Sequence, residues 1–194
     1  MFAQLDTKSV YSFMDSVVDL PSYVKRAKEL GYQALGLMDR DSLYAAYHFA
    51  QLATKNGLRP LIGMEANLVY EGRMIAFRLL AKNNQGYKNL MKLATELSSG
   101  QREFTALSNY LNEIALILPS EEWEPGMAFE SDVFIGVRPE DAGKEFDYPV
   151  LPLHTVRYFD NVDRSTIQML HAISQNVSLS EASICPCLLY TSPS

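Results

Sequence analysis

The chain is poor in cysteine and contains no long apolar run. It has 194 residues and only two cysteines, Cys185 and Cys187. No segment approaches the roughly 20 consecutive apolar residues that cross a bilayer. The first residues lack the basic region and the apolar region of a signal peptide. Together these absences predict a cytoplasmic protein without a membrane partner.

The composition is that of an ordinary globular protein. Hydrophobic residues make up 47% of the chain and charged residues 21%, which argues against disorder. The length allows one domain with a substantial core. The net charge is −6, whereas modules that grip DNA usually present a basic face to its phosphates. We therefore do not expect this domain to be a main DNA clamp.

The C-terminal residues differ in character from the rest. From Ala182 onwards the sequence is rich in serine, proline and small residues. Cys185 and Cys187 resemble half of a metal site, but the chain has no further cysteine to complete one. We expect residues 1–181 to form the domain, as a fragment of a longer chain, and residues 182–194 to be a non-native or disordered tail.

Short apolar strands alternate with amphipathic helices along residues 1–181, which favours a parallel α/β fold, either a barrel or an open sheet. Helices are expected at residues 20–30, 43–55, 85–97 and 162–173. Strands are expected at residues 34–37, 60–63, 66–70, 74–80, 113–118, 133–137 and 149–153. Of these, 66–70 and 74–80 are expected to form a hairpin across the Glu71-Gly72 turn. Asp39, Glu65 and His154 fall just after strands, where α/β folds build their sites.

Four segments carry a family resemblance. They contain Asp6 with Lys8, then Met38-Asp39-Arg40, Gly63-Met64-Glu65 and His154-Thr155-Val156-Arg157. In order and spacing they resemble the metal-ligand segments of the polymerase-and-histidinol-phosphatase (PHP) domain, in the form that opens the α subunit of DNA polymerase III in low-GC Gram-positive bacteria. The resemblance covers residues 1–181 and implies a distorted seven-stranded, TIM-like β/α barrel.

The same resemblance implies a degenerate site. Active PHP domains hold zinc, manganese or iron through histidine and carboxylate side chains, and the metals activate water for attack on phosphate. Here Lys8, Arg40 and Arg157 stand where the family has histidines, and Thr155 replaces an aspartate. We expect no catalytic residue and no bound metal. The donors that remain for a metal, if one binds, are Asp6, Asp39, Glu65 and His154.

The basic replacements suggest a physical hypothesis. Carboxylates that share a cavity repel one another unless a cation lies between them. Lys8, Arg40 and Arg157 would supply fixed positive charges in place of metal ions. Replacing Arg40 with alanine would then cost roughly 3 kcal/mol or more if its ion pair is buried. Two simpler alternatives stay open: Asp39 caps a helix that begins near Leu43, and Glu65 is an ordinary surface acid.

For function, the resemblance implies a structural and interaction module of a replicative DNA polymerase. Its partners would be the rest of the α subunit, replisome accessory subunits and, through the parent chain, DNA. The magnesium-binding palm of such a polymerase lies outside this fragment, so no cofactor is expected here. The alternative is a metal-dependent phosphoesterase, such as a 3′→5′ proofreading exonuclease. A free-standing histidinol phosphatase would need an intact site.

Overall fold

A computed structural model describes residues 3–130, 132–141 and 143–182. These residues group into two compact units. The first unit comprises residues 3–39, 44–60 and 154–182, and the second comprises Arg40–Leu43 and Leu61–Leu153. Cys185 and Cys187 lie outside the described residues, as does the predicted tail after Ala182.

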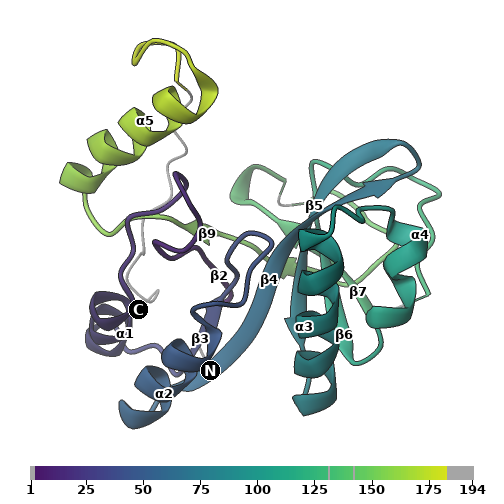
Figure 1. The fold of residues 1–194 in the computed structure, drawn as a ribbon, viewed down its shortest axis with the longest axis horizontal. Helices are drawn as coiled ribbons and strands as arrows, with labels where there is room; N and C mark the ends of the chain where they lie inside the picture. The colour runs from purple at the N-terminus through teal and green to yellow at the C-terminus, as the bar shows by residue number, and fades with distance from the viewer. Residues whose placement is uncertain (1–2, 131, 142, 183–194) are drawn as a thin grey trace. The chain divides into compact units, whose positions relative to one another are not determined.

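The first unit contains two small parallel strand pairs and three helices (Figure 1). Strand β1 pairs with β3, and β2 pairs with β9. Helix α1 packs against α2, which also contacts β3. The bounds are β1 Ala3–Gln4, β2 Asp6–Thr7, α1 Leu20–Glu29, β3 Ala34–Leu37, α2 Ala46–Lys55, β9 Thr155–Val156 and α5 Asn161–Gln175.

Helix α1 follows the sequence signals closely. Asp19 caps it by accepting a hydrogen bond from the backbone N–H of Ser22 at 3.0 Å, and a proline occupies the first turn. One face of the helix is buried, including Tyr23, whose ring stacks on Phe49 of α2 at 6.0 Å between ring centroids. Burial raises the pKa of the Tyr23 phenol above its ordinary value. The neutral hydroxyl donates to Gly36 O at 3.0 Å and accepts from Thr7.

Gly36, in β3, permits a close approach of two backbone segments. A Cβ atom at this position would lie 1.8 Å from the carbonyl oxygen of Leu5. We expect Gly36→Ala to lower the free energy of unfolding by about 3 kcal/mol, because the backbone must shift to admit the methyl group. Chemical denaturation measures this loss. Gly31→Ala is the comparison: nothing lies within 4 Å there, so its loss comes only from the positive φ of +79° and should be about 1 kcal/mol. Equal losses at both positions would contradict the close-approach explanation.

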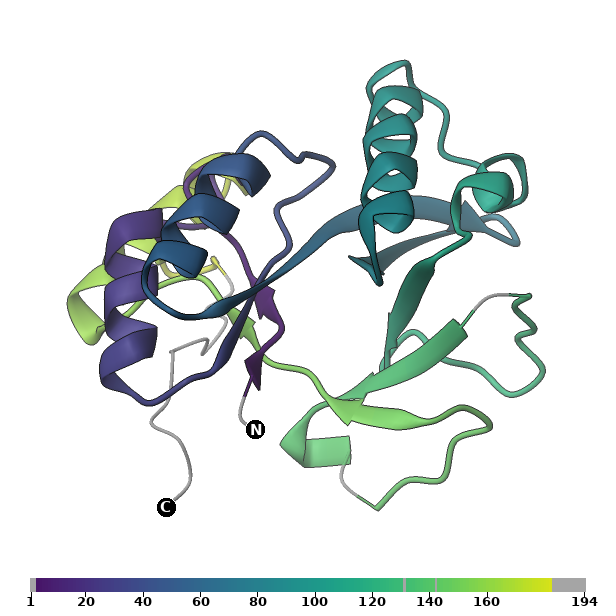
Figure 2. The same ribbon diagram turned by 90° about the horizontal axis from the view of Figure 1, so that it is seen from below.

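The second unit is built on a mixed sheet with the strand order β4-β5-β6-β7-β8. Strands β4, β5 and β6 are antiparallel neighbours, whereas β7 and β8 continue the sheet in parallel. Helix α3 packs against β5 and β6 (Figure 2). The bounds are β4 Arg59–Tyr70, β5 Arg73–Ala81, α3 Asn84–Ser98, α4 Phe104–Leu107, η1 Ser108–Tyr110, β6 Ile114–Pro119, β7 Asp132–Val137, η2 Pro139–Asp141 and β8 Val150–Pro152.

The core of the second unit lies between this sheet and α3. Its fully buried members include Met64 and Leu68 of β4, Phe77 of β5, and Leu90 and Leu93 of α3. On the helix these residues are three apart, and on the strands the apolar core positions alternate, so both periodicities direct apolar side chains to one core.

The α/β class is confirmed, with nine strands in the described residues, seven of them in one sheet. Three details of the prediction were wrong. The strands expected at 60–63 and 66–70 form one continuous strand, β4, because its backbone pairs with β5 without interruption from Gly63 to Tyr70. The hairpin of β4 and β5 was expected, but the antiparallel pairing of β5 with β6 departs from the parallel sheet that the sequence favoured. Helix α2 begins at Ala46 rather than Leu43, and its N-cap residue Ala45 makes no side-chain hydrogen bond.

None of the helices in the described ranges combines the length and the apolar character that a bilayer crossing requires.

Candidate functional site

The parallel pairing of β2 with β9 places Asp6 beside Thr155. The two residues are register partners although 149 positions separate them. The Thr155 hydroxyl donates to Oδ2 of Asp6 at 2.7 Å. Asp6 is fully buried, so its carboxylate depends on protein groups for the hydrogen bonds that water would otherwise make. Two of the site positions named from sequence are therefore in direct contact.

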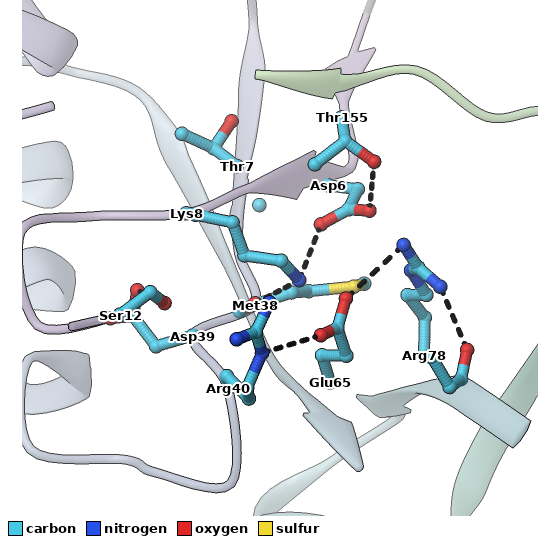
Figure 3. Close-up of polar contacts among 12 residues, drawn as sticks. Asp6, Thr7, Lys8, Ser12, Met38, Asp39, Arg40, Glu65, Arg78 and Thr155 are labelled. Carbon is cyan, nitrogen blue, oxygen red and sulfur yellow. Dashed lines mark hydrogen bonds and ion pairs between the residues drawn. The ribbon is translucent and has the colours of Figure 1, made fainter. Parts of the chain in front are cut away.

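Lys8 supplies the charge that balances Asp6. Its ammonium lies 3.0 Å from Oδ1 of Asp6 and donates to the carbonyl oxygen of Met38 at 2.5 Å (Figure 3). Both side chains of the pair are 0% exposed. The two members of such a buried ion pair attract each other strongly. Removing one of them leaves the other as an unpaired charge in a medium of low dielectric constant.

Asp39 binds the loop that follows β2. Its carboxylate accepts hydrogen bonds from the backbone N–H of Ser9 at 2.6 Å and from the hydroxyls of Ser9 and Ser12, both at 2.7 Å. Asp39 is 2% exposed. The alternative in which Asp39 caps the following helix is wrong, because α2 begins seven residues later and its cap makes no side-chain bond.

Arg157 pairs with an acid that the sequence did not single out. Its Nε lies 2.9 Å from Oδ1 of Asp15, and Nε2 of His171 lies 3.4 Å from the same oxygen. Asp15 is 5% exposed. The cluster joins the loop after β2, the segment after β9 and helix α5. No local sequence signal could have identified Asp15 as the partner, because 142 residues separate it from Arg157.

His154 precedes β9. Its carbonyl oxygen accepts a hydrogen bond from the Gln4 side chain at 2.6 Å, and its side chain is partly buried. Gln4 also donates to the carbonyl oxygen of Asp6 at 3.0 Å. The backbone next to the Asp6–Thr155 contact is thus held in place by a buried amide.

In the second unit, Glu65 lies between two arginines (Figure 3). Nε of Arg40 is 3.2 Å from Oε1 of Glu65, and an Nη atom of Arg78 is 3.1 Å from Oε2. The Glu65 side chain is 4% exposed, that of Arg78 9% and that of Arg40 45%. Glu65 is therefore a buried member of an ion-pair network. The alternative hypothesis that Glu65 is an ordinary surface acid is wrong.

Arg78 was missed from sequence, although a signal for it existed. The Glu71-Gly72 turn makes Tyr70 and Arg73 register partners. Counting away from the turn, backwards along β4 and forwards along β5, puts Glu65 opposite Arg78. Side chains directly opposite in an antiparallel pair lie close together. The turn position thus carried the information needed to find the second arginine.

The carboxylates at these positions already have cationic or hydroxyl partners. Both oxygens of Asp6 and both oxygens of Glu65 are engaged by lysine, threonine or arginine groups. An ammonium or guanidinium group cannot bind a metal, and its charge opposes the approach of one. Across the described residues, no three histidine, cysteine, aspartate or glutamate side chains form a group that could hold a metal ion. These residues do not fit the metal centre that the resemblance implies for active members.

Comparisons with known proteins point to the PHP family. A family model for the PHP domain matches residues 4–126. A DNA polymerase III subunit alpha from Streptococcus pyogenes serotype M3 is 45% identical over 186 residues, covering 95% of this chain and 18% of the relative. A DNA polymerase III subunit alpha from Aquifex aeolicus is 33% identical over 113 residues, covering 48% of this chain and 10% of that protein. The chain thus spans less than a fifth of the length of these relatives.

Among solved structures, one similar protein is a proposed metal-dependent phosphoesterase from Bifidobacterium adolescentis. It is 16% identical, with a TM-score of 0.43, and the match covers 50% of this chain and 33% of that one. At this TM-score the likeness carries no argument about function.

Proposed function

Since this chain belongs to the PHP domain family, we propose that it is the N-terminal PHP module of a bacterial DNA polymerase III α subunit, with a structural and interaction role and no metal centre of its own. The 45% identity to the streptococcal α subunit supports the assignment to DNA replication in the cytoplasm. The parent chain would extend primers from deoxynucleoside triphosphates, with residues that lie beyond this module.

The Lys8–Asp6 ion pair is the observation that carries this proposal. The carboxylate stands at a family ligand position, yet a buried ammonium lies 3.0 Å from it. The ammonium supplies the positive charge that a metal would otherwise supply. The Arg40–Glu65–Arg78 network repeats this arrangement in the second unit. In the proposed role these pairs brace the module instead of activating water.

The metal content of the purified chain tests the proposal. After dialysis against zinc and manganese, we expect inductively coupled plasma mass spectrometry to find a stoichiometry near zero, because lysine and arginine groups hold the carboxylate oxygens. We also expect no release of nucleotides from the 3′ end of a labelled DNA primer. One tightly held metal per chain, with primer degradation, would instead establish the exonuclease alternative.

A rebuilt variant provides the positive control. Lys8→His with Thr155→Asp restores an imidazole and a carboxylate beside Asp6, and these are natural donors for zinc. We expect this double variant to retain more zinc than the unmodified chain, provided that circular dichroism shows both to be folded. A rebuilt variant that binds no more zinc than the unmodified chain would mean that Lys8 is not what excludes the metal.

A further inference from the structure

The second unit contains a cavity away from Glu65 and its arginines. Its volume is about 760 Å³, within the roughly 300–1,000 Å³ of typical ligand sites. Its wall includes the hairpin end Val69–Glu71, residues of α4 and η1 from Glu103 onwards, the start of β6 around Glu113, and the segment around Phe129; Lys82 completes it. The proposed role in the polymerase uses none of these residues.

Aromatic rings form part of the cavity lining. Tyr70 lies edge-on to Phe104 at 5.3 Å between ring centroids, and Phe129 lies 5.0 Å from Tyr70 and 5.6 Å from Phe104. Phe77, in the core, contacts both phenylalanine rings and so fixes their positions. The faces of aromatic rings attract cations, and rings that are already held in place bind one with little further cost in side-chain ordering.

The charged groups of the lining are almost all acidic. They comprise one lysine, Lys82, and the carboxylates of Glu71, Glu103, Glu113, Glu130 and Asp132. Lys82 is paired with Asp132 at 2.5 Å. Glu113 accepts a hydrogen bond from Asn83 at 2.6 Å.

Three carboxylates of this lining make no side-chain hydrogen bond or ion pair with the described residues. Glu71, Glu103 and Glu130 are exposed, and none has a side-chain partner within the part of the chain that the structure describes. Carboxylates gathered around an aromatic lining give the cavity a negative potential that repels phosphate groups and attracts cations. The cavity is therefore a poor match for nucleic acid and a good match for a basic side chain.

We propose that this cavity is a docking site for an arginine-bearing segment of a partner protein. A guanidinium group can interact with both the aromatic rings and the carboxylates of the lining. Its planar face stacks on aromatic rings, and its edge donates in pairs to carboxylates. The ammonium of lysine is a compact, strongly hydrated point charge and satisfies only the second requirement. The proposal does not depend on the role in the polymerase.

Fluorescence anisotropy with a labelled Gly-Arg-Gly-Arg-Gly peptide tests this site on the 194-residue chain. We expect saturable binding that is weakened about tenfold in the triple variant Glu71→Gln/Glu103→Gln/Glu130→Gln, because three charge-assisted contacts are lost. The matched control is Glu29→Gln/Glu140→Gln/Glu145→Gln, which removes the same charge from exposed positions outside the cavity. Binding by this control should equal that of the unmodified chain. A Gly-Lys-Gly-Lys-Gly peptide should bind more weakly than the arginine peptide.

Four outcomes would overturn the proposal. One is the absence of saturable binding, and another is an equal loss in both triple variants, which would mean that net charge alone attracts the peptide. Equal affinity for the lysine peptide would remove the role of the aromatic lining. Displacement by spermidine at the same concentration as by the arginine peptide would identify a polyamine site instead of a protein-docking site.

Discussion

Replacing Lys8 with methionine is expected to lower the free energy of unfolding by about 3–5 kcal/mol. Methionine keeps the length of the side chain but leaves the Asp6 carboxylate buried without its cation, and the carbonyl oxygen of Met38 loses its donor. Both members of the pair are completely shielded from solvent, so water cannot compensate for the loss. Urea denaturation at neutral pH, followed by circular dichroism, measures the change.

Two further variants show whether the loss of stability comes from breaking the buried ion pair. Lys28→Met removes an exposed charge from α1 and should change stability by less than about 0.5 kcal/mol. The double variant Asp6→Leu/Lys8→Met removes both charges, so it should be more stable than Lys8→Met alone. If Lys8→Met were as stable as the unmodified chain, the ion pair would have no stabilising role and the structural part of the proposed function would fail.

The second large effect is expected at Arg78. Arg78→Met should cost about 3 kcal/mol, near the lower end for a broken buried pair, because Arg40 still compensates one oxygen of Glu65. The Arg78 side chain is 9% exposed and also donates to the carbonyl oxygen of Ala76 at 2.7 Å. The same denaturation experiment measures the loss. Arg73→Met, in the same strand, serves as the control, since its ion pairs lie at the surface.

The structure lowers the contribution to stability that the sequence predicted for Arg40. The estimate of roughly 3 kcal/mol for Arg40→Ala applied to a buried pair. With 45% of its side chain exposed, Arg40 should contribute only about 0.2–1 kcal/mol, since water screens its interaction with Glu65. A larger loss in Arg40→Ala than in Arg78→Met would show that the solvated arginine, and not the buried one, holds Glu65.

The candidate site was predictable where its signals are local. Asp6 and Lys8 are two positions apart in an extended segment, so their side chains point to the same side and can pair. Arg78 was predictable in principle from the Glu71-Gly72 turn. Asp15 was not, because its contact with Arg157 depends on how the loop after β2 meets the segment after β9.

By itself, the sequence determined the positions of α1, α3 and α5 and of strand β3, because capping residues and apolar periodicity act over a few neighbouring residues. The family resemblance adds a prediction, that Lys8, Arg40 and Arg157 stand where active PHP domains have histidines. Only the tertiary structure decided which acid each basic residue meets and which pairs are buried. Those outcomes depend on strand register and on contacts between distant segments, and in a low-dielectric interior burial sets how much an ion pair contributes to stability.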